Sequence, residues 1–183
     1  MFLQRDASGV TLRRLDLRDV RVLHVAAHAL MDDRSLQRNV LALSPSATED
    51  GLLGPDDLSA LKLNQALVVL SGCRTVGGVV LSAEGLRGLT APLLEAGARA
   101  VMATQWAIGD ASVLPMVDRI YAHLAEGVDV ATALQRAKRD AIRDHVKPAV
   151  WAAFTLVGDG SMRAPLSPAH TPPLPWSRAT TEH

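Results

Sequence analysis

The stretch Ala66-Leu67-Val68-Val69-Leu70-Ser71-Gly72-Cys73-Arg74-Thr75 joins an apolar run to a small-residue turn that holds the only cysteine of the 183 residues. An apolar run of this length bounded by a turn predicts a buried strand with Cys73 at its carboxyl end. Parallel α/β sheets hold their reactive groups at that end. Cys73 is therefore a candidate nucleophile. An inert buried thiol is the alternative, because free cysteine is among the most buried residue types.

A second apolar run, Val20-Arg21-Val22-Leu23-His24-Val25-Ala26-Ala27-His28, predicts another strand and ends on a histidine. If the two strands are parallel neighbours about 4.8 Å apart, His28 and Cys73 emerge at the same edge of the sheet. An unperturbed thiol has a pKa of about 8.5, so a nearby imidazole is needed to form the nucleophilic thiolate at neutral pH. The pair predicts a Cys–His dyad that attacks a carbonyl and passes through a thioester.

Strand and helix signals alternate on both sides of Cys73. Apolar runs predict strands at 100–105 and 154–158, each preceded by amphipathic helical segments. Two short apolar pieces around a turn-rich stretch predict a hairpin within residues 39–53, and a short helix starts at Pro55. Alternation of this kind predicts an α/β fold with a parallel sheet covered on both faces.

The helix after Cys73 contains a discordant residue. Ser82 is a suitable cap and Gly97 a suitable end for this helix. Pro92 stands inside it, where proline removes a hydrogen bond and costs about 3 kcal/mol. We therefore expect a kink, or a break near Thr90.

Trp106 and Asp110 follow the predicted strand 100–105 and are candidates for lining a substrate-specificity site. The alternative is structural: Trp106 packs in the core, and Asp110 or Ser112 caps the next helix. Asp129 is expected to cap the helix after that one.

His24 and His28 are four residues apart, which raises the possibility of a metal site. On one strand such residues stand roughly 13 Å apart, too far to share an ion. We expect His24 to be buried and hydrogen-bonded instead, and predict neither a metal nor a cofactor. The chain also has no glycine-rich phosphate-binding motif and no Gly-x-Ser-x-Gly elbow.

The segments Leu23–His28 and Leu70–Thr75 resemble the two active-site segments of CHAT-domain proteins, which are caspase-like cysteine peptidases often joined to tetratricopeptide repeats. The resemblance covers Val20 to Gly160. Later segments that agree in order are Ala83–Leu89, Ala96–Val101, Gln105-Trp106 and Trp151–Asp159.

This resemblance implies a caspase-like three-layer α/β/α sandwich with a mostly parallel sheet. It also implies further strands before the histidine strand, for which Met1–Asp19 leaves little room. We therefore expect residues 1–163 to form an N-terminally truncated peptidase domain: a fragment, a chain with a late-called start codon, or a chain that completes its sheet with a partner. Residues 164–183 are proline-rich and are expected to be a disordered tail.

The resemblance also implies an oxyanion hole formed by the backbone amides of Cys73 and Ala29. Caspases carry glycine where this chain has Ala29, but a backbone N–H does the work. Many family members have an acidic residue at the position of Arg74 and alanine at that of Gly72. Metacaspases have aspartate where this chain has Ser71, so cleavage after Arg or Lys is not supported.

Composition narrows the functional classes. The chain has 48% hydrophobic and 21% charged residues and a formal net charge of +0, without a basic cluster, so no nucleic-acid surface is expected. The sequence has no long apolar span, so no membrane segment is predicted. A single cysteine fits a reducing cytoplasm.

The first functional hypothesis is a cysteine endopeptidase that acts on a protein or peptide substrate. It is expected to be controlled by a tetratricopeptide-repeat or other sensing partner or domain. The second is an inactive or truncated CHAT domain that serves as a protein-interaction module, and the third is another Cys–His acyl-transfer enzyme.

Overall fold

The computed structural model describes residues 7–30, 39–72, 83–164 and 166, except for the side chains of residues 83–87 and 110. Its centre is a four-stranded sheet in the order β1-β5-β6-β7, in which the first three strands are parallel and the last is antiparallel to its neighbour. These strands are β1 (Val22–Val25), β5 (Leu67–Leu70), β6 (Ala100–Thr104) and β7 (Phe154–Gly158). The predicted α/β class with a mostly parallel sheet is confirmed.

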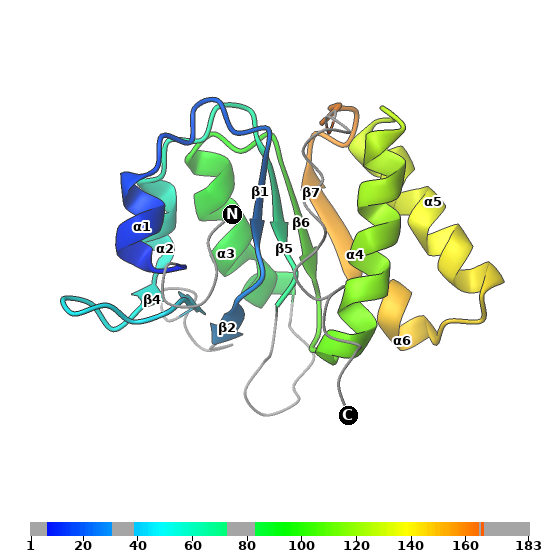
Figure 1. Cartoon of the computed structure of the whole chain (residues 1–183), viewed down its shortest axis with the longest axis horizontal. Helices are drawn as coiled ribbons and strands as arrows, with labels where there is room; N and C mark the ends of the chain where they lie inside the picture. Colours follow the sequence, from blue (N-terminus) through cyan, green and yellow to red (C-terminus); the bar gives the residue numbers. More distant parts are fainter. Residues whose placement is uncertain (1–6, 31–38, 73–82, 165, 167–183) are drawn as a thin grey trace, which may run out of the picture.

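Helices cover both faces of this sheet, which gives three layers (Figure 1). One face carries α1 (Gly9–Arg14), α2 (Pro55–Ser59) and α3 (Ala83–Glu95). The other carries α4 (Asp110–Ala125), α5 (Val130–Arg143) and α6 (Pro148–Trp151). The predicted short helix from Pro55 is present as α2.

Alternate residues of the central strands serve two separate cores. Val68 and Leu70 of β5 pack with Leu89 and Leu93 of α3, whereas the neighbouring Val69 packs in the core beneath α4 and α5. All of them are at most 2% exposed. Burying one such side chain contributes about 1.5–3 kcal/mol, so both faces of the sheet need a helical cover.

The predicted strand 20–28 is wrong in one respect, because the chain divides it between two sheets. β1 ends at Val25, and His28 begins β2 (His28–Leu30), which pairs antiparallel with β3 (Val40–Ala42). β3 pairs in turn with β4 (Leu52–Leu53), which confirms the predicted hairpin. Ala29 is fully buried in the core that this small sheet shares with α1, and this burial favours the departure from β1.

Of the two alternatives, a kink or a break near Thr90, the break is wrong, because α3 continues from Ala83 to Glu95 through Pro92. Leu89 and Leu93 on either side of the proline are each 1% exposed. Their burial offsets the roughly 3 kcal/mol that an interior proline costs. The helix ends as expected, since Gly97 adopts a φ of 98°.

The cap of α4 also differs from the prediction. Gly109 is the N-cap residue and Asp110 already belongs to the helix, so neither Asp110 nor Ser112 caps it. The carbonyl of Gly109 accepts hydrogen bonds from the amides of Ser112 and Val113 at 2.8 and 3.1 Å. The cap of α5 is confirmed: the carboxylate of Asp129 accepts from the amide of Thr132 at 2.8 Å.

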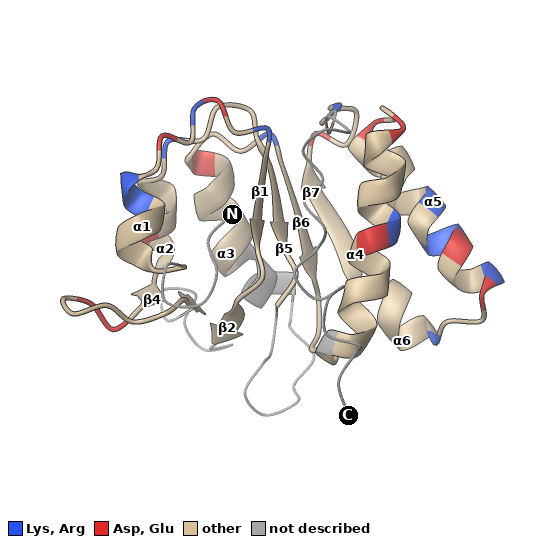
Figure 2. Ribbon diagram, viewed as in Figure 1, with Lys and Arg blue, Asp and Glu red and all other residues tan. Residues whose placement is uncertain are grey.

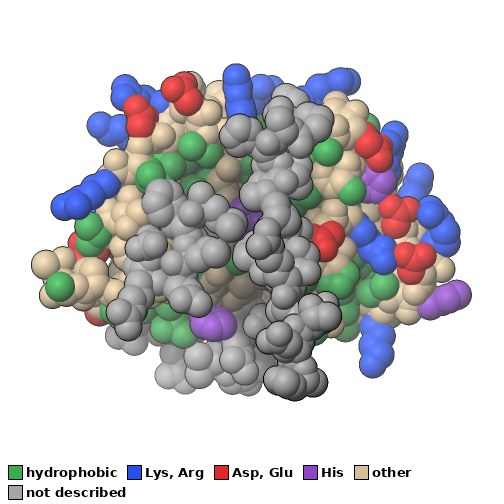
Figure 3. Space-filling view, in the orientation of Figure 1, with side chains coloured by type: hydrophobic (Ala, Val, Ile, Leu, Met, Phe, Trp, Pro, Cys, Tyr) green, Lys and Arg blue, Asp and Glu red, His purple; other side chains and the backbone are tan. Residues whose placement is uncertain are grey.

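Charged side chains lie on the helices and loops, and none lies on the four central strands (Figure 2). On the face shown in Figure 3, both basic and acidic side chains lie around the periphery. No helix of the described part of the chain is long and apolar enough to cross a membrane. Met162 and Ala164 are buried in the core with α4 and α5, and the tail beyond residue 166 lies outside the described residues.

Candidate functional site

The parallel register of β1 and β5 relates the two candidate catalytic residues. Val25 pairs with Leu70, and the amide of Ser71 donates to the carbonyl of Val25 at 3.2 Å. Counting three residues beyond this pair along each segment reaches His28 and Cys73. The two residues therefore follow the same end of neighbouring strands.

The chain approaches itself most closely at Gly72. A Cβ atom at this position would lie 2.2 Å from the carbonyl oxygen of Ala27 and 2.7 Å from its nitrogen, both backbone atoms. Only glycine fits such an approach, because real Cβ atoms essentially never come within 3.0 Å of another heavy atom. Ala27 and Gly72 are the residues immediately before His28 and Cys73. The segments that lead into both candidate catalytic residues therefore touch.

The structure describes two of the three residues of the predicted dyad and oxyanion hole. His28 is exposed at the start of β2, where it pairs with Ala42. Ala29 follows it and has no exposed surface in this structure. The role of its backbone amide as an oxyanion donor stays a prediction. Cys73, its thiol and its amide lie outside the described residues, as does Arg74.

His24 has a partner that sequence reasoning missed. Its Nε2 atom lies 2.6 Å from the hydroxyl oxygen of Ser71, and its ring stacks on that of Tyr121 at a centroid distance of 5.6 Å and an angle of 24°. Burial lowers the pKa of His24 from 6.5 to about 4, so the imidazole is neutral near pH 7. The hydrogen-bonded role expected for His24 is confirmed.

The separation used above to dismiss a metal site assumed one continuous strand, yet His24 and His28 lie in different sheets. Within the described residues, no group of three or more His, Cys, Asp or Glu side chains could hold a metal ion.

Trp106 makes a structural contact at the carboxyl end of β6. Its indole Nε1 donates to the carbonyl of Ala149 at 2.8 Å, which ties the loop after β6 to α6. Trp106 is half-buried, and Asp110 opens α4 with its side chain outside the described part. Their role in substrate binding stays a prediction.

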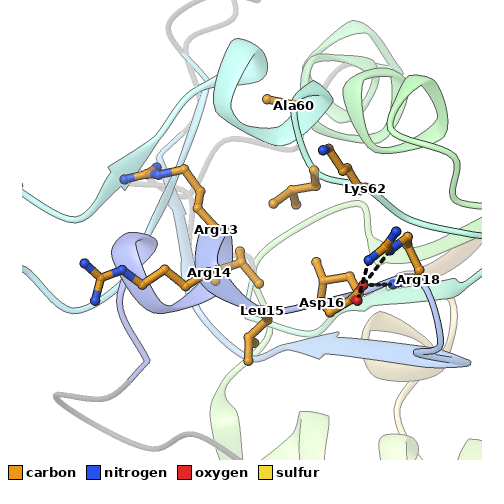
Figure 4. A pocket seen from close by; sticks show the side chains of 10 residues that line it. Arg13, Arg14, Leu15, Asp16, Arg18, Ala60 and Lys62 are labelled. Atoms are coloured by element: carbon orange, nitrogen blue, oxygen red, sulfur yellow. Dashed lines mark hydrogen bonds and ion pairs between the residues drawn. The ribbon is translucent and has the colours of Figure 1, made fainter.

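A pocket of about 400 Å³ lies at the opposite edge of the sheet, beside the segments that enter β1 and β5 (Figure 4). Leu12, Leu17 and Leu61 form its apolar wall, and they are 8%, 2% and 7% exposed. The lining arginines are largely paired: Arg13 with Glu49 and Asp57, and Arg18 with Asp16. His28 is not among the residues that line this pocket.

The mostly parallel sheet between two helical layers (Figure 1) is consistent with a caspase-like α/β fold. The model of the CHAT domain family matches residues 1–159, and the chain belongs to this family. It is 34% identical over 119 residues to tetratricopeptide repeat protein 28 of Mus musculus, a match that covers 63% of this chain and 5% of the mouse protein. The human protein of the same name is 28% identical over 141 residues, with coverage of 75% and 6%. The chain thus spans only about a twentieth of the length of these relatives.

Proposed function

We propose that this CHAT domain is a cysteine endopeptidase in which His28 activates Cys73. The observation that carries the proposal is the contact between Gly72 and the backbone of Ala27, one residue before each member of the pair. The parallel register of β1 and β5 supports the same alignment. The exposure of His28 supports it too, because a catalytic base must reach substrate and solvent.

In the proposed mechanism His28 accepts the thiol proton of Cys73, and the thiolate attacks the carbonyl carbon of a peptide bond. The backbone amides of Ala29 and Cys73 donate to the oxyanion. His28 then transfers its proton to the leaving amine, and a thioester remains on Cys73. Water hydrolyses the thioester, which regenerates the thiol and releases the acyl product as a carboxylic acid.

The control of this activity is proposed from the relatives, which are named for tetratricopeptide repeats. A repeat array or another sensing domain or partner would expose the site to a protein substrate when it binds its signal. We propose residues 1–163 as the peptidase domain and a reducing cytoplasm as its compartment, where the single cysteine stays a thiol.

The test is the rate of Cys73 alkylation by iodoacetamide as a function of pH. It uses the wild type, His28→Ala, and His145→Asn as a control. His145 is another exposed histidine, and its φ of 56° is one that asparagine tolerates. We expect a thiol pKa below the ordinary value of about 8.5 in the wild type and in His145→Asn, rising in His28→Ala.

Peptide libraries screened with the same proteins and with Cys73→Ala then test cleavage. Cleavage that requires both Cys73 and His28 supports the proposal. An ordinary thiol pKa that His28→Ala leaves unchanged overturns the dyad and favours a CHAT domain that binds proteins without cutting them.

A further inference from the structure

A side-chain hydrogen bond links β1 to the residue that directly follows β5, next to the segments that lead to the candidate dyad. His24 lies in β1, paired in register with Val69 of β5. Ser71 stands two residues beyond Val69, so an extended chain directs the side chains of Val69 and Ser71 to the same face of the sheet. The side chain of His24 lies on this face too, because His24 is in register with Val69. There the Nε2 atom of His24 meets the hydroxyl of Ser71 at 2.6 Å, although the residues are 47 positions apart.

The surroundings hold this pair in place. Ser71 is only 7% exposed, and its amide also bonds to the carbonyl of Val25 at 3.2 Å. Tyr121 of α4 stacks on the imidazole from the helix side at 5.6 Å. A neutral imidazole can either donate to the hydroxyl or accept from it, so the contact needs no charge.

We propose that His24 is a positioning residue: its hydrogen bond to Ser71 fixes the end of β5 against β1 and thereby sets the distance between His28 and Cys73. The inference rests on the proposed dyad. Ser71 directly precedes Gly72, so the hydrogen bond and the close approach to Ala27 act on consecutive residues.

The chemistry of the dyad explains why such a bond matters. Proton transfer between a thiol and an imidazole requires the two groups to lie within hydrogen-bond reach. A misplacement of about 1 Å costs on the order of 100-fold in rate. The His24–Ser71 bond holds the backbone directly after β5, two residues before Cys73.

Two substitutions of His24 separate the hydrogen bond from the ring. His24→Phe keeps an aromatic ring against Tyr121 but removes both nitrogens. His24→Gln gives up the ring and brings an amide nitrogen to about the place of Nε2. Ser71→Ala removes the hydroxyl from the other side, and Tyr121→Phe, which keeps the stacked ring, is the control.

The first readout is the pH profile of Cys73 alkylation in variants shown to be folded by their far-UV spectra and unfolding midpoints. We expect His24→Phe and Ser71→Ala to alkylate about 10-fold more slowly at pH 7, with the thiol pKa raised toward its free value. His24→Gln and Tyr121→Phe stay within about 3-fold of the wild type. The double variant His24→Phe/Ser71→Ala loses no more than either single variant, because both remove the same bond.

Peptide turnover gives the second readout. A positioning role lowers kcat and leaves KM unchanged, because the substrate does not touch His24. A folded His24→Phe variant with a wild-type alkylation profile and kcat overturns the proposal. Covalent labelling of Ser71 by a fluorophosphonate also overturns it, because the pair would then be a serine nucleophile and its base.

Hydrogen exchange of the Ser71 amide separates failure of this inference from failure of the dyad. If His28→Ala leaves the thiol pKa unchanged, the dyad has failed and the positioning role fails with it. The experiment still measures whether His24 stabilises the end of β5. Exchange of the Ser71 amide that is about 10-fold faster in His24→Phe and Ser71→Ala, but not in His24→Gln, supports this stabilisation. Equal exchange in all variants overturns it even where the dyad is active.

Discussion

Gly72 shows how one missing side chain sets the geometry of the site. A methyl group at this position would lie 2.2 Å from the carbonyl oxygen of Ala27, and a backbone atom cannot rotate away as a side chain can. We expect Gly72→Ala to separate the two segments and lower the free energy of unfolding by about 1–3 kcal/mol. It should also slow Cys73 alkylation at pH 7. Denaturant titration and the alkylation assay measure both effects.

Gly109→Ala is the matched control, because an added Cβ at Gly109 meets no atom within 4 Å and the φ of this residue is −63°. We expect a change of less than about 1 kcal/mol, since a weaker N-cap and a less flexible unfolded chain act in opposite directions. Equal effects of Gly72→Ala and Gly109→Ala would contradict the close approach.

The buried imidazole of His24 makes stability depend on pH. Its pKa is about 4 in the folded chain and 6.5 in the unfolded one, so the unfolded chain takes up the proton first as the pH falls. The free energy of unfolding should therefore drop between about pH 6.5 and pH 4, by up to about 3 kcal/mol, and this loss is complete below pH 4. His24→Phe lacks the effect, which denaturant titrations at pH 7, 5.5 and 4 detect. The same pH slope in both proteins would contradict the low pKa.

Elements with a strong local pattern were predictable from the sequence. β5 is a continuous apolar run whose four residues are all buried, and α5 has an acceptor side chain at Asp129 before apolar residues that share one face. In these segments the preference of the local sequence agrees with the packing of the whole chain.

The elements that differed from prediction depend on contacts with distant residues. The pattern of apolar residues around Ala26 is the same whether β1 continues or the chain leaves it to form β2. Pairing with β5 in one sheet and with β3 in the other decides where β1 ends. Pro92 is accommodated by the burial of its helical neighbours. Gly109 has no side chain that would mark it as a cap.

The candidate site also contains residues that the local sequence predicts and a contact that it does not. His28 and Cys73 stand out because each follows an apolar run in the sequence. The partnership of His24 with Ser71 requires the register of β1 and β5, which no local pattern reveals.

The cap of α5 gives a prediction at the level of one element. The carboxylate of Asp129 accepts from both the amide and the hydroxyl of Thr132, at 2.8 and 2.9 Å. We expect Asp129→Ala to lower the melting temperature by a few degrees, because a helix amide loses its acceptor. Asp129→Asn keeps a capping oxygen and should melt near the wild type. If Asp129→Asn melts as early as Asp129→Ala, charge rather than capping is responsible.

At the scale of the whole molecule, the two cores are linked through the sheet that separates them. Neighbouring residues of β5, such as Val68 and Val69, pack in opposite cores, and β6 alternates in the same way. If the strands separate from the helices on one face, the residues of the same strands that pack in the other core lose their support as well. The part of the chain that the structure describes should therefore unfold in one cooperative transition.

Two core substitutions test this linkage. Leu93 of α3 and Leu124 of α4 are 1% and 0% exposed in opposite cores, and replacing either by alanine should cost about 2–5 kcal/mol. Trp106 and Trp151 both lie on the side of α4 and α6, so with Trp176→Phe in the background their fluorescence reports that side alone. We expect Leu93→Ala, on the far side of the sheet, to lower the midpoint seen by fluorescence as much as the midpoint seen by far-UV circular dichroism. A fluorescence transition that stays at the wild-type midpoint in Leu93→Ala would mean that the two helical layers unfold independently.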